Sequence, residues 1–397
     1  MSLFPIFDYS NIDKPDEFIE HYTANIANTP MDMSKPLWEF LVLNIKTSNA
    51  ESLGIGKLHH SLGDGMSLMS LLLASSRNIS DPNAVLTTPT TKKYVDPNDK
   101  GWWLVNRFWF LIKVILITVI EMFKSLLTLC LMRDTKTPLM GKSGDEIRSR
   151  KIIHRIKSFD DVKLVKNTME MKVNDVLLGM TQAGLSRYLS RKYGDEVTVV
   201  EKKQILEKIR LRGTMAVNLR PNTNIEDLAN MMAKGSTCRW GNFLGILIFP
   251  LWIRSQDDPL EYVRRAKATM DKKKLSLESL IFYGIIKFTM KIYGEKAVES
   301  IAKRIFGHTT LTFSNVLGPN EEISFFDHPM SYVGASALVG PQALIIHFVS
   351  YVNKIIINLA VDTTVIPDPH ALCDDLVESL DLIKLAILKK GLPQMEV

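Results

Sequence analysis

Cysteine is scarce in this chain of 397 residues: Cys130, Cys238 and Cys373 stand far apart and in no Cys-x-x-Cys spacing. An odd number of widely spaced cysteines argues against a disulfide framework and a structural zinc site, so we expect a reducing compartment and no bound metal. No basic segment precedes an apolar run at the start of the chain, so nothing indicates a secretory signal. The chain also has no Gly-x-Ser-x-Gly elbow, phosphate-binding loop or dinucleotide fingerprint, which disfavours a serine lipase and nucleotide-dependent enzymes.

Neither sign of charge dominates, since 49 Lys and Arg residues face 43 Asp and Glu residues for a net charge of +6. This balance excludes a nucleic-acid polycation, so we expect no nucleic-acid partner. A mildly basic protein fits an anionic ligand or an anionic membrane surface better. The chain is 46 % hydrophobic and 23 % charged, as ordinary globular proteins are. At roughly 100–200 residues per domain, its length corresponds to about two domains.

Alternating strand and helix patterns predict an α/β class with mixed sheets and two lobes. Strands are expected at 38–45, 53–58, 151–156, 216–219, 311–315, 330–334, 344–352 and 354–361, and helices at 11–29, 66–75, 173–193 and 368–388. Segments rich in Pro and Thr or in polar residues at 78–101 and 134–146 are typical of linkers. We therefore divide the chain into an N-terminal lobe at 1–100, a hydrophobic helix at 101–133 and a C-terminal lobe at 134–397.

The most hydrophobic stretch covers residues 102–132. Arg107, Lys113, Glu121 and Lys124 interrupt it, so no uncharged run approaches the length of about 18 residues typical of a transmembrane helix. On a helix, its polar residues fall within an arc of roughly 140° and the rest is apolar. The polar stripe consists of Asn106, Arg107, Lys113, Thr118, Glu121, Lys124, Ser125 and Thr128.

Three interpretations of this helix stay open. We favour an amphipathic helix that lies in the plane of a membrane surface and leaves its polar stripe among the headgroups. A tilted single span is the second, with its charges facing a partner or reaching the interface. A long helix packed on the protein's own core is the third.

A candidate catalytic motif, His-His-Ser-Leu-Gly-Asp-Gly, occupies positions 59–65 between an expected strand and an expected helix. Adjacent histidines at a strand end point to opposite faces, so one of the two reaches a given site. Asp64 can return across a tight turn to hold a ring or the local backbone, and Gly63 and Gly65 permit that turn. The pattern predicts a functional histidine at a strand–turn–helix junction.

The longer string from His59 to Leu68 resembles the plant wax ester synthase/diacylglycerol acyltransferase branch of the CoA-dependent, chloramphenicol-acetyltransferase-like acyltransferases. Further blocks are similar to the same branch, and the resemblance runs from about residue 30 to about residue 390. These blocks are Asn218-Leu219-Arg220-Pro221, Trp240-Gly241-Asn242 with Pro250-Leu251, Ser314-Asn315-Val316-Leu317-Gly318-Pro319, and Val361-Asp362 through Ile366-Pro367-Asp368.

The resemblance implies two α/β lobes, each a mixed sheet with flanking helices, and a tunnel between them. It implies an O-acyltransferase of lipid biosynthesis that joins a fatty acyl-CoA to a long-chain alcohol, giving a wax ester, or to diacylglycerol, giving triacylglycerol. His60 is then the general base of a direct ternary-complex reaction, beside His59, while Asp64 orients the motif. Acyl-CoA is a co-substrate, and no cofactor is implied. The candidate tunnel residues are Asn218, Arg220, Ser314 and Asn315.

Long-chain substrates are nearly insoluble, so we expect the endoplasmic reticulum membrane, or also the plasma membrane, with both lobes cytosolic. Only 58 residues precede His59, fewer than this branch usually carries, which motivates an alternative: a catalytically impaired lipid-binding or regulatory homologue. A water-soluble acyltransferase with a small acceptor is a third hypothesis, although that branch's Asp-Phe-Gly-Trp-Gly block is absent. The scattered histidines are interpreted as structural or surface residues: His154, His308, His328, His347 and His370.

Overall fold

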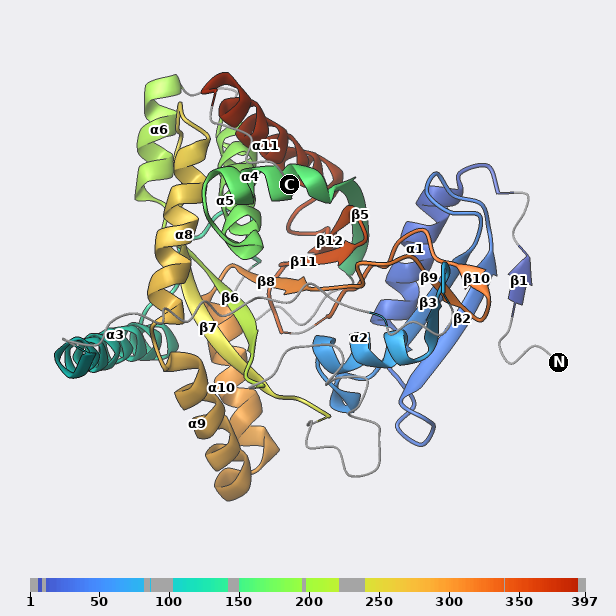
Figure 1. Cartoon of the computed structure of the whole chain (residues 1–397), viewed down its shortest axis with the longest axis horizontal. Coiled ribbons are helices and arrows are strands. Elements are labelled where there is room, and N and C mark those ends of the chain that lie inside the picture. Colours follow the sequence, from blue (N-terminus) through green and yellow to red (C-terminus); the bar gives the residue numbers. More distant parts are fainter. Residues whose placement is uncertain are drawn as a thin grey trace.

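The structure is a computed structural model that describes residues 6–8, 12–81, 86, 103–141, 150–194, 198–220, 240–338 and 340–391 (Figure 1). Cys238, Pro221 and most of the expected linker at 78–101 lie outside these residues. Its elements are β1 (Ile6–Asp8), α1 (Pro15–Asn28), β2 (Trp38–Asn44), β3 (Leu53–Leu58), the 3-10 turn η1 (His60–Leu62), α2 (Gly65–Ala74), β4 (Ser76–Asn78), α3 (Trp103–Cys130), β5 (Arg150–Ser158), α4 (Phe159–Thr168), α5 (Val173–Lys192), α6 (Val199–Lys208), β6 (Leu211–Asn218), β7 (Leu244–Leu251), α8 (Leu260–Lys274), α9 (Glu278–Tyr293), α10 (Glu295–His308), β8 (Leu311–Val316), β9 (Ile323–Phe325), β10 (His328–Pro329), β11 (Leu344–Tyr351), β12 (Lys354–Asp362) and α11 (Pro369–Lys389).

A six-stranded mixed sheet forms the centre of the second lobe, in the order β5-β12-β11-β8-β6-β7. Strands β11 and β12 form an antiparallel hairpin, while β8 pairs in parallel with β11 and with β6. Nearly every residue of β11 and β12 is buried because both faces of these strands are covered. Their continuous apolar runs follow from that double cover.

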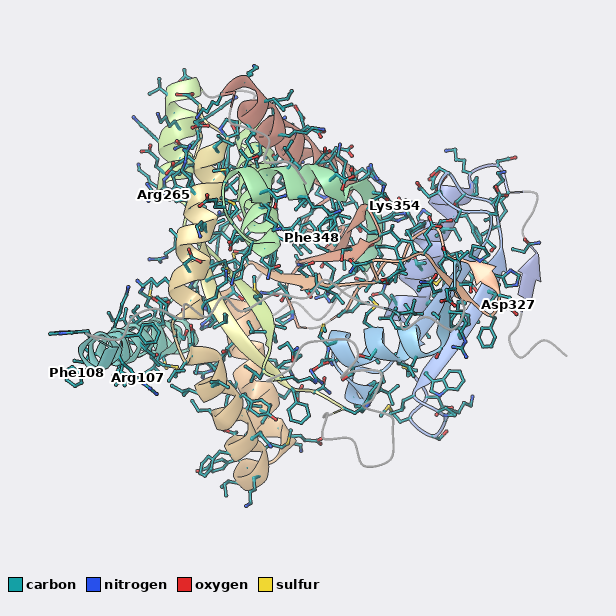
Figure 2. All side chains as sticks on the ribbon, in the orientation of Figure 1. Arg107, Phe108, Arg265, Asp327, Phe348 and Lys354 are labelled. Atoms are coloured by element: carbon teal, nitrogen blue, oxygen red, sulfur yellow. The ribbon has the colours of Figure 1, made fainter. Side chains whose placement is uncertain are left out.

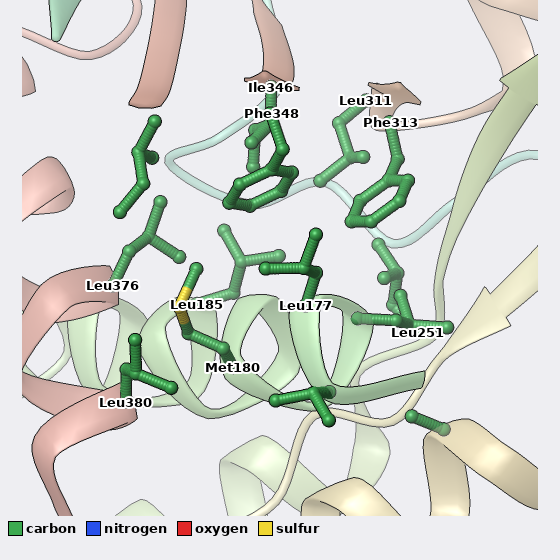
Figure 3. Close-up of a cluster of buried hydrophobic side chains, with 14 of the residues drawn as sticks. Leu177, Met180, Leu185, Leu251, Leu311, Phe313, Ile346, Phe348, Leu376 and Leu380 are labelled. Atoms are coloured by element: carbon green, nitrogen blue, oxygen red, sulfur yellow. The ribbon is translucent and has the colours of Figure 1, made fainter. Parts of the chain in front are cut away.

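The main core lies between this sheet and helix α5. Figure 3 shows Ile346 and Phe348 of β11 pointing toward α5, where they meet Leu177 and Leu185. Helices α8 and α11 flank α5 (Figure 1), and its positions 175–186 are buried all round. Burial of so many apolar side chains fixes which face of β11 turns toward α5.

The opposite face of β11 and β12 meets the first lobe. Met69 and Leu73 of α2 pack in one cluster with Val349, Tyr351 and Ile356 of the large sheet. The first lobe also holds a three-stranded sheet in the order β1-β2-β3. Helix α2, which directly follows the histidine motif, therefore packs against the sheet of the second lobe.

A short segment from the second half of the chain, Ile323–Pro329, pairs with a strand of the first lobe. Strand β9 pairs with β10 and, on its other side, antiparallel with β4. The strand expected at 330–334 is wrong, because the pairing lies at Ile323–Pro329 instead. Tyr332 and Val333 instead pack against the cluster between α2 and the sheet, and no strand in the described part of the chain pairs with them. The lobe boundaries set at 100 and 134 stay a prediction.

Helix α3 forms where the hydrophobic segment predicts it, but four residues of its polar stripe face the protein. Thr118, Glu121, Ser125 and Thr128 are buried, while the apolar side is exposed. The expectation that this stripe lies among lipid headgroups is wrong for these four residues, because they bond to groups on α8, α9 and β6. No helix in the described part of the chain is long and apolar enough to span a bilayer.

Candidate active site

The histidine motif lies between the end of β3 at Leu58 and the start of α2 at Gly65. His59 precedes the 3-10 turn, and its Nδ1 accepts a hydrogen bond from the Ser61 backbone N–H at 3.3 Å and lies 2.7 Å from Ser61 Oγ. Both histidines therefore lie beyond the strand, so strand alternation does not separate them. The two histidines differ in role because the ring of His59 caps the 3-10 turn.

His60 is the first residue of the 3-10 turn and is exposed. Its backbone carbonyl accepts a hydrogen bond of 2.9 Å from the Asn242 side chain. Within the described residues, the His60 ring forms no hydrogen bond. A neutral imidazole in this state has a free lone pair that can accept a proton from a substrate.

Asp64 is fully buried and acts on the backbone of the turn. One carboxylate oxygen accepts the Ser67 N–H at 3.0 Å and so caps the start of α2. The other accepts from Arg220 Nη1 at 2.8 Å and from the Phe243 N–H at 3.0 Å. These contacts hold the turn that presents His60.

Of the two residues expected along the substrate tunnel, Arg220 contacts the histidine motif directly and Asn218 contacts Arg220. Arg220 donates through Nη2 to Ser67 Oγ at 2.9 Å and to the Gly241 carbonyl at 2.7 Å. Asn218 Oδ1 accepts from the backbone N–H and from Nη1 of Arg220, at 3.1 Å each. Trp240 Nε1 donates to the Leu62 carbonyl at 2.7 Å. The blocks at 218–220 and 240–243 thus clamp the motif from the second lobe.

Gly63 and Gly65 serve close packing. Gly63 has a φ of 165°, which is extended backbone that any residue adopts, and Gly65 is not among the residues with a left-handed φ, so the turn does not depend on the conformational freedom of glycine. A Cβ on Gly63 would lie 2.8 Å from the Cβ of Ser67, and one on Gly65 would lie 3.2 Å from Val316 Cγ2. Their missing side chains let α2 approach both its own turn and β8.

Ser314 and Asn315 lie on β8, beside the residue that contacts Gly65. Ser314 is in register with His347 of β11. Asn315 Nδ2 donates to Asn174 Oδ1 at 2.6 Å, at the start of α5. The sequence did not indicate Asn174 as a partner of Asn315. It belongs to the Asn174-Asp175 pair at the start of α5, and such pairs are also ordinary features of helix starts.

His347 is near the site although the sequence indicated only a structural or surface histidine. It is 6 % exposed. Burial and, to a smaller extent, the charge that His60 can carry together lower the pKa of His347 to about 4, so the two rings are within electrostatic range. The available signal was a single histidine within the otherwise apolar run 344–349.

The arrangement suits proton transfer by an imidazole. The free ring of His60 stands on a turn that buried polar contacts fix from two lobes. Among the described residues, no group of three or more His, Cys, Asp or Glu side chains could hold a metal ion.

Two family models match this chain. One, described as the wax ester synthase/diacylglycerol acyltransferase catalytic domain, matches residues 15–177, and the WS/DGAT C-terminal domain matches residues 240–384. Wax ester synthase/diacylglycerol acyltransferase 3 of Arabidopsis thaliana is 75 % identical over 393 residues, covering 99 % of this chain and 80 % of that protein. Wax ester synthase/diacylglycerol acyltransferase 1 of the same plant is 67 % identical, covering 96 % and 79 %.

Solved structures show the same fold at low sequence identity. A wax ester synthase/diacylglycerol acyltransferase from Marinobacter aquaeolei VT8 has a TM-score of 0.58 at 16 % identity, covering 96 % of this chain and 78 % of its own. The first condensation domain of the CDA synthetase has a TM-score of 0.50 at 11 % identity, covering 96 % and 75 %. These likenesses confirm the expected fold class.

Proposed function

This chain belongs to the wax ester synthase/diacylglycerol acyltransferase family, and from that premise we propose that it is an O-acyltransferase acting on acyl-CoA. It transfers the fatty acyl group to the hydroxyl of a long-chain alcohol, of diacylglycerol, or of both. The observation that carries the proposal is the exposed ring of His60, without a hydrogen bond in the described structure, on a turn fixed by buried contacts.

His60 is the general base of the proposed reaction. Its free ring nitrogen takes the proton of the acceptor hydroxyl while that oxygen forms a bond to the thioester carbonyl carbon. The carbon–sulfur bond then breaks, and the departing CoA thiolate takes the proton back from the imidazolium. General-base catalysis of this kind contributes typically about 10²–10⁴-fold. Binding both substrates in the correct orientation supplies much of the remainder.

His59 and Asp64 support this step without exchanging protons with the substrate. The Nδ1 of His59 already accepts a hydrogen bond within the turn. Asp64 accepts from Arg220 and from two backbone N–H groups, which leaves its carboxylate engaged. Both residues keep the backbone of His60 in place.

The experiment is direct acyl transfer by the purified chain. Radiolabelled palmitoyl-CoA is offered with hexadecanol or with dioleoylglycerol, and ester and free CoA are measured together. We expect one CoA released for each ester formed, and no ester from the His60→Ala variant. Binding of palmitoyl-CoA without ester from either acceptor would support a catalytically impaired lipid-binding homologue instead.

We also propose that the chain works on a membrane surface, with α3 and α9 facing the lipid. Phe108 and Trp109 near the outer end of α3 are 60 % and 63 % exposed, and Phe288 and Tyr293 of α9 are 62 % and 70 % exposed. Figure 2 shows Phe108 at the end of α3 that extends from the body of the protein. Apolar area of this kind is typical of an interaction surface.

The charges on these two helices favour an anionic lipid surface. Lys113, Lys287 and Lys291 are exposed, whereas Glu121 and Glu278 are buried. The described outer surface of α3 and α9 therefore combines apolar side chains with basic ones, the pattern of interfacial membrane helices. The endoplasmic reticulum, or also the plasma membrane, with both lobes on the cytosolic side, is part of this proposal. Protease protection of a tagged chain in isolated microsomes tests it.

A further inference from the structure

Strand alternation places His347 on the face of β11 opposite to α5. Ile346 and Phe348 point toward α5 in Figure 3, so the residue between them points the other way. On that other face, Val349 and Tyr351 pack with residues of α2, the helix that follows the histidine motif. His347 therefore lies on the side of the sheet from which His60 is presented.

The neighbours of His347 in the sheet are polar as well. It stands directly opposite Asn358 on β12 and Ser314 on β8. His347 Nδ1 and Asn358 Nδ2 are both buried, and within the described structure neither has a hydrogen-bond partner. A buried polar atom without a partner destabilises the folded state, so two of them side by side in a sheet need an explanation.

These two atoms are complementary. Asn358 Nδ2 is a donor, and Nδ1 of a neutral imidazole can be an acceptor. Because the two residues oppose one another across the hairpin, a small side-chain rotation would let Asn358 donate to His347 Nδ1. The proton of the neutral ring would then be on Nε2, which makes that nitrogen a donor.

His347 stays neutral over the range in which enzymes work. Burial, and then the charge that His60 can carry, lower its pKa to about 4. A neutral imidazole can polarise a carbonyl by donating a hydrogen bond, without giving up its proton. It acts most strongly where water is excluded, and His347 is 6 % exposed.

We propose that His347 donates a hydrogen bond from Nε2 to the carbonyl oxygen of the acyl thioester, and that Asn358 fixes the tautomer that permits it. This inference rests on the proposed acyl transfer. As the acceptor oxygen bonds to the thioester carbon, negative charge develops on the carbonyl oxygen, and the His347 N–H stabilises it. The charge returns to the carbonyl bond when the carbon–sulfur bond breaks. His60 moves the proton, while His347 keeps its own.

The test compares two substitutions at His347. His347→Phe keeps a ring of similar shape without the donor, and His347→Gln places an amide N–H about where Nε2 lies. We expect His347→Phe to lower kcat about 10²–10³-fold, the range found when one such donor is removed. The KM for palmitoyl-CoA should change little, and His347→Gln should recover at least a tenth of the wild-type kcat.

His154→Phe is the matched control. His154 lies on β5 in the same row of the sheet, directly opposite Asn358, and its ring stacks on Tyr332. His154 neighbours Asn358, the positioning residue, but it is one strand farther from His347 than Asn358 is. We therefore expect His154→Phe to leave kcat unchanged. Melting temperatures of all three variants separate loss of catalysis from loss of folding.

The outcomes distinguish this inference from the proposed function. An inactive wild-type chain would overturn the acyl-transfer proposal itself. If wild type is active and folded His347→Phe retains its kcat, the donor role of His347 alone is wrong. A His347→Phe variant whose kcat falls only because the pH midpoint moves would show that His347 tunes His60 instead. Equal losses in His347→Phe and His154→Phe would indicate a general packing effect.

Discussion

Arg220 and Asp64 form an ion pair between the two lobes, with Arg220 Nη1 2.8 Å from Asp64 Oδ2 and side chains 3 % and 0 % exposed. The two residues are 156 positions apart in the chain. The aspartate of the histidine motif is thus the point at which the second lobe holds the first.

Removing one partner of this pair should destabilise the protein strongly. Asp64→Asn removes the carboxylate charge that faces the buried Arg220 guanidinium, and loss of one partner of a buried ion pair typically costs about 3–5 kcal/mol of unfolding free energy. Urea unfolding of wild type and variant measures the difference. The control is the double variant Asp64→Leu, Arg220→Met. Its loss of unfolding free energy should be smaller than the sum of the losses in the single variants Asp64→Leu and Arg220→Met. If Asp64→Asn lost activity at unchanged stability, Asp64 would have a direct catalytic role.

Replacing His60 should remove activity and leave folding intact. The ring is exposed and forms no hydrogen bond within the described residues, so His60→Ala should not change the melting temperature. Loss of a general base should lower kcat about 10²–10⁴-fold. His59→Ala, which removes the two contacts of His59 Nδ1 with Ser61 inside the turn, should cost less activity. A folded His60→Ala variant with wild-type kcat would contradict the mechanism.

A methyl group at Gly63 should disturb the site through contact alone. The added Cβ would be 2.8 Å from the Cβ of Ser67, on a helix that is fixed at both ends. Overpacking of this kind typically costs about 1–3 kcal/mol. Thermal unfolding and activity should both fall in Gly63→Ala. Gly284→Ala in α9 is the matched control: nothing lies within 4 Å of its added Cβ, and Ala is the better helix former, so its stability should rise slightly.

The sequence predicted elements well where one pattern dominates a segment. The strands at 53–58, 344–352 and 354–361 and the helix at 66–75 were confirmed almost to the residue. Strand β6 was expected only at 216–219, yet it begins at Leu211. Arg212 interrupts the apolar pattern there, and its pairing with buried Asp134 becomes visible only in the fold.

It was harder to predict which side of an element faces the protein, and which distant residues it contacts, than to predict the element itself. Periodicity grouped Thr118, Glu121, Ser125 and Thr128 on one side of α3, but it cannot say which side of a helix meets the protein. That side was decided by Lys273 and Glu278, more than 150 positions away from Glu121. Likewise, His347 could not be assigned to the site without the strand register that places Asn358 and Ser314 beside it.

The contact between α3 and the body should weaken in acid. Burial raises the pKa of Glu121, but hydrogen bonds and charges from Lys124 and Lys273 outweigh it and lower the pKa from 4.5 to about 2. The folded state thus binds this proton less readily than the unfolded state. The stabilisation is complete above pH 4.5 and is lost as pH falls toward 2.

The variant Glu121→Gln tests this pH dependence. At neutral pH it should be less stable than wild type by about 3 kcal/mol, since a tenfold change in proton affinity corresponds to about 1.4 kcal/mol. Urea unfolding at a series of pH values should show this difference shrinking between pH 5 and the lowest pH at which both proteins fold. If the difference in unfolding free energy between wild type and Glu121→Gln stays constant with pH, ionisation of Glu121 is not its cause.

Charged substitutions on the outer face of α3 should release the protein from membranes. Ile115, Val119 and Phe123 are 58 %, 61 % and 60 % exposed, so Asp at these positions should not disturb the core. Flotation with vesicles of phosphatidylcholine and phosphatidylserine measures binding, which we expect to fall at least tenfold. The same change at Val200, Leu385 and Leu388, on α6 and α11, is the control and should leave binding intact.

The pairing of β9 with β4 limits how this enzyme can admit its substrates. A backbone ladder joins the lobes at one place, and the Asp64–Arg220 contact joins them at another. Two such attachments leave the line that joins them as the natural axis for relative rotation of the lobes, because opening in another direction would break the backbone ladder or the buried ion pair. Any widening of the space beside His60 is therefore expected to follow that one direction.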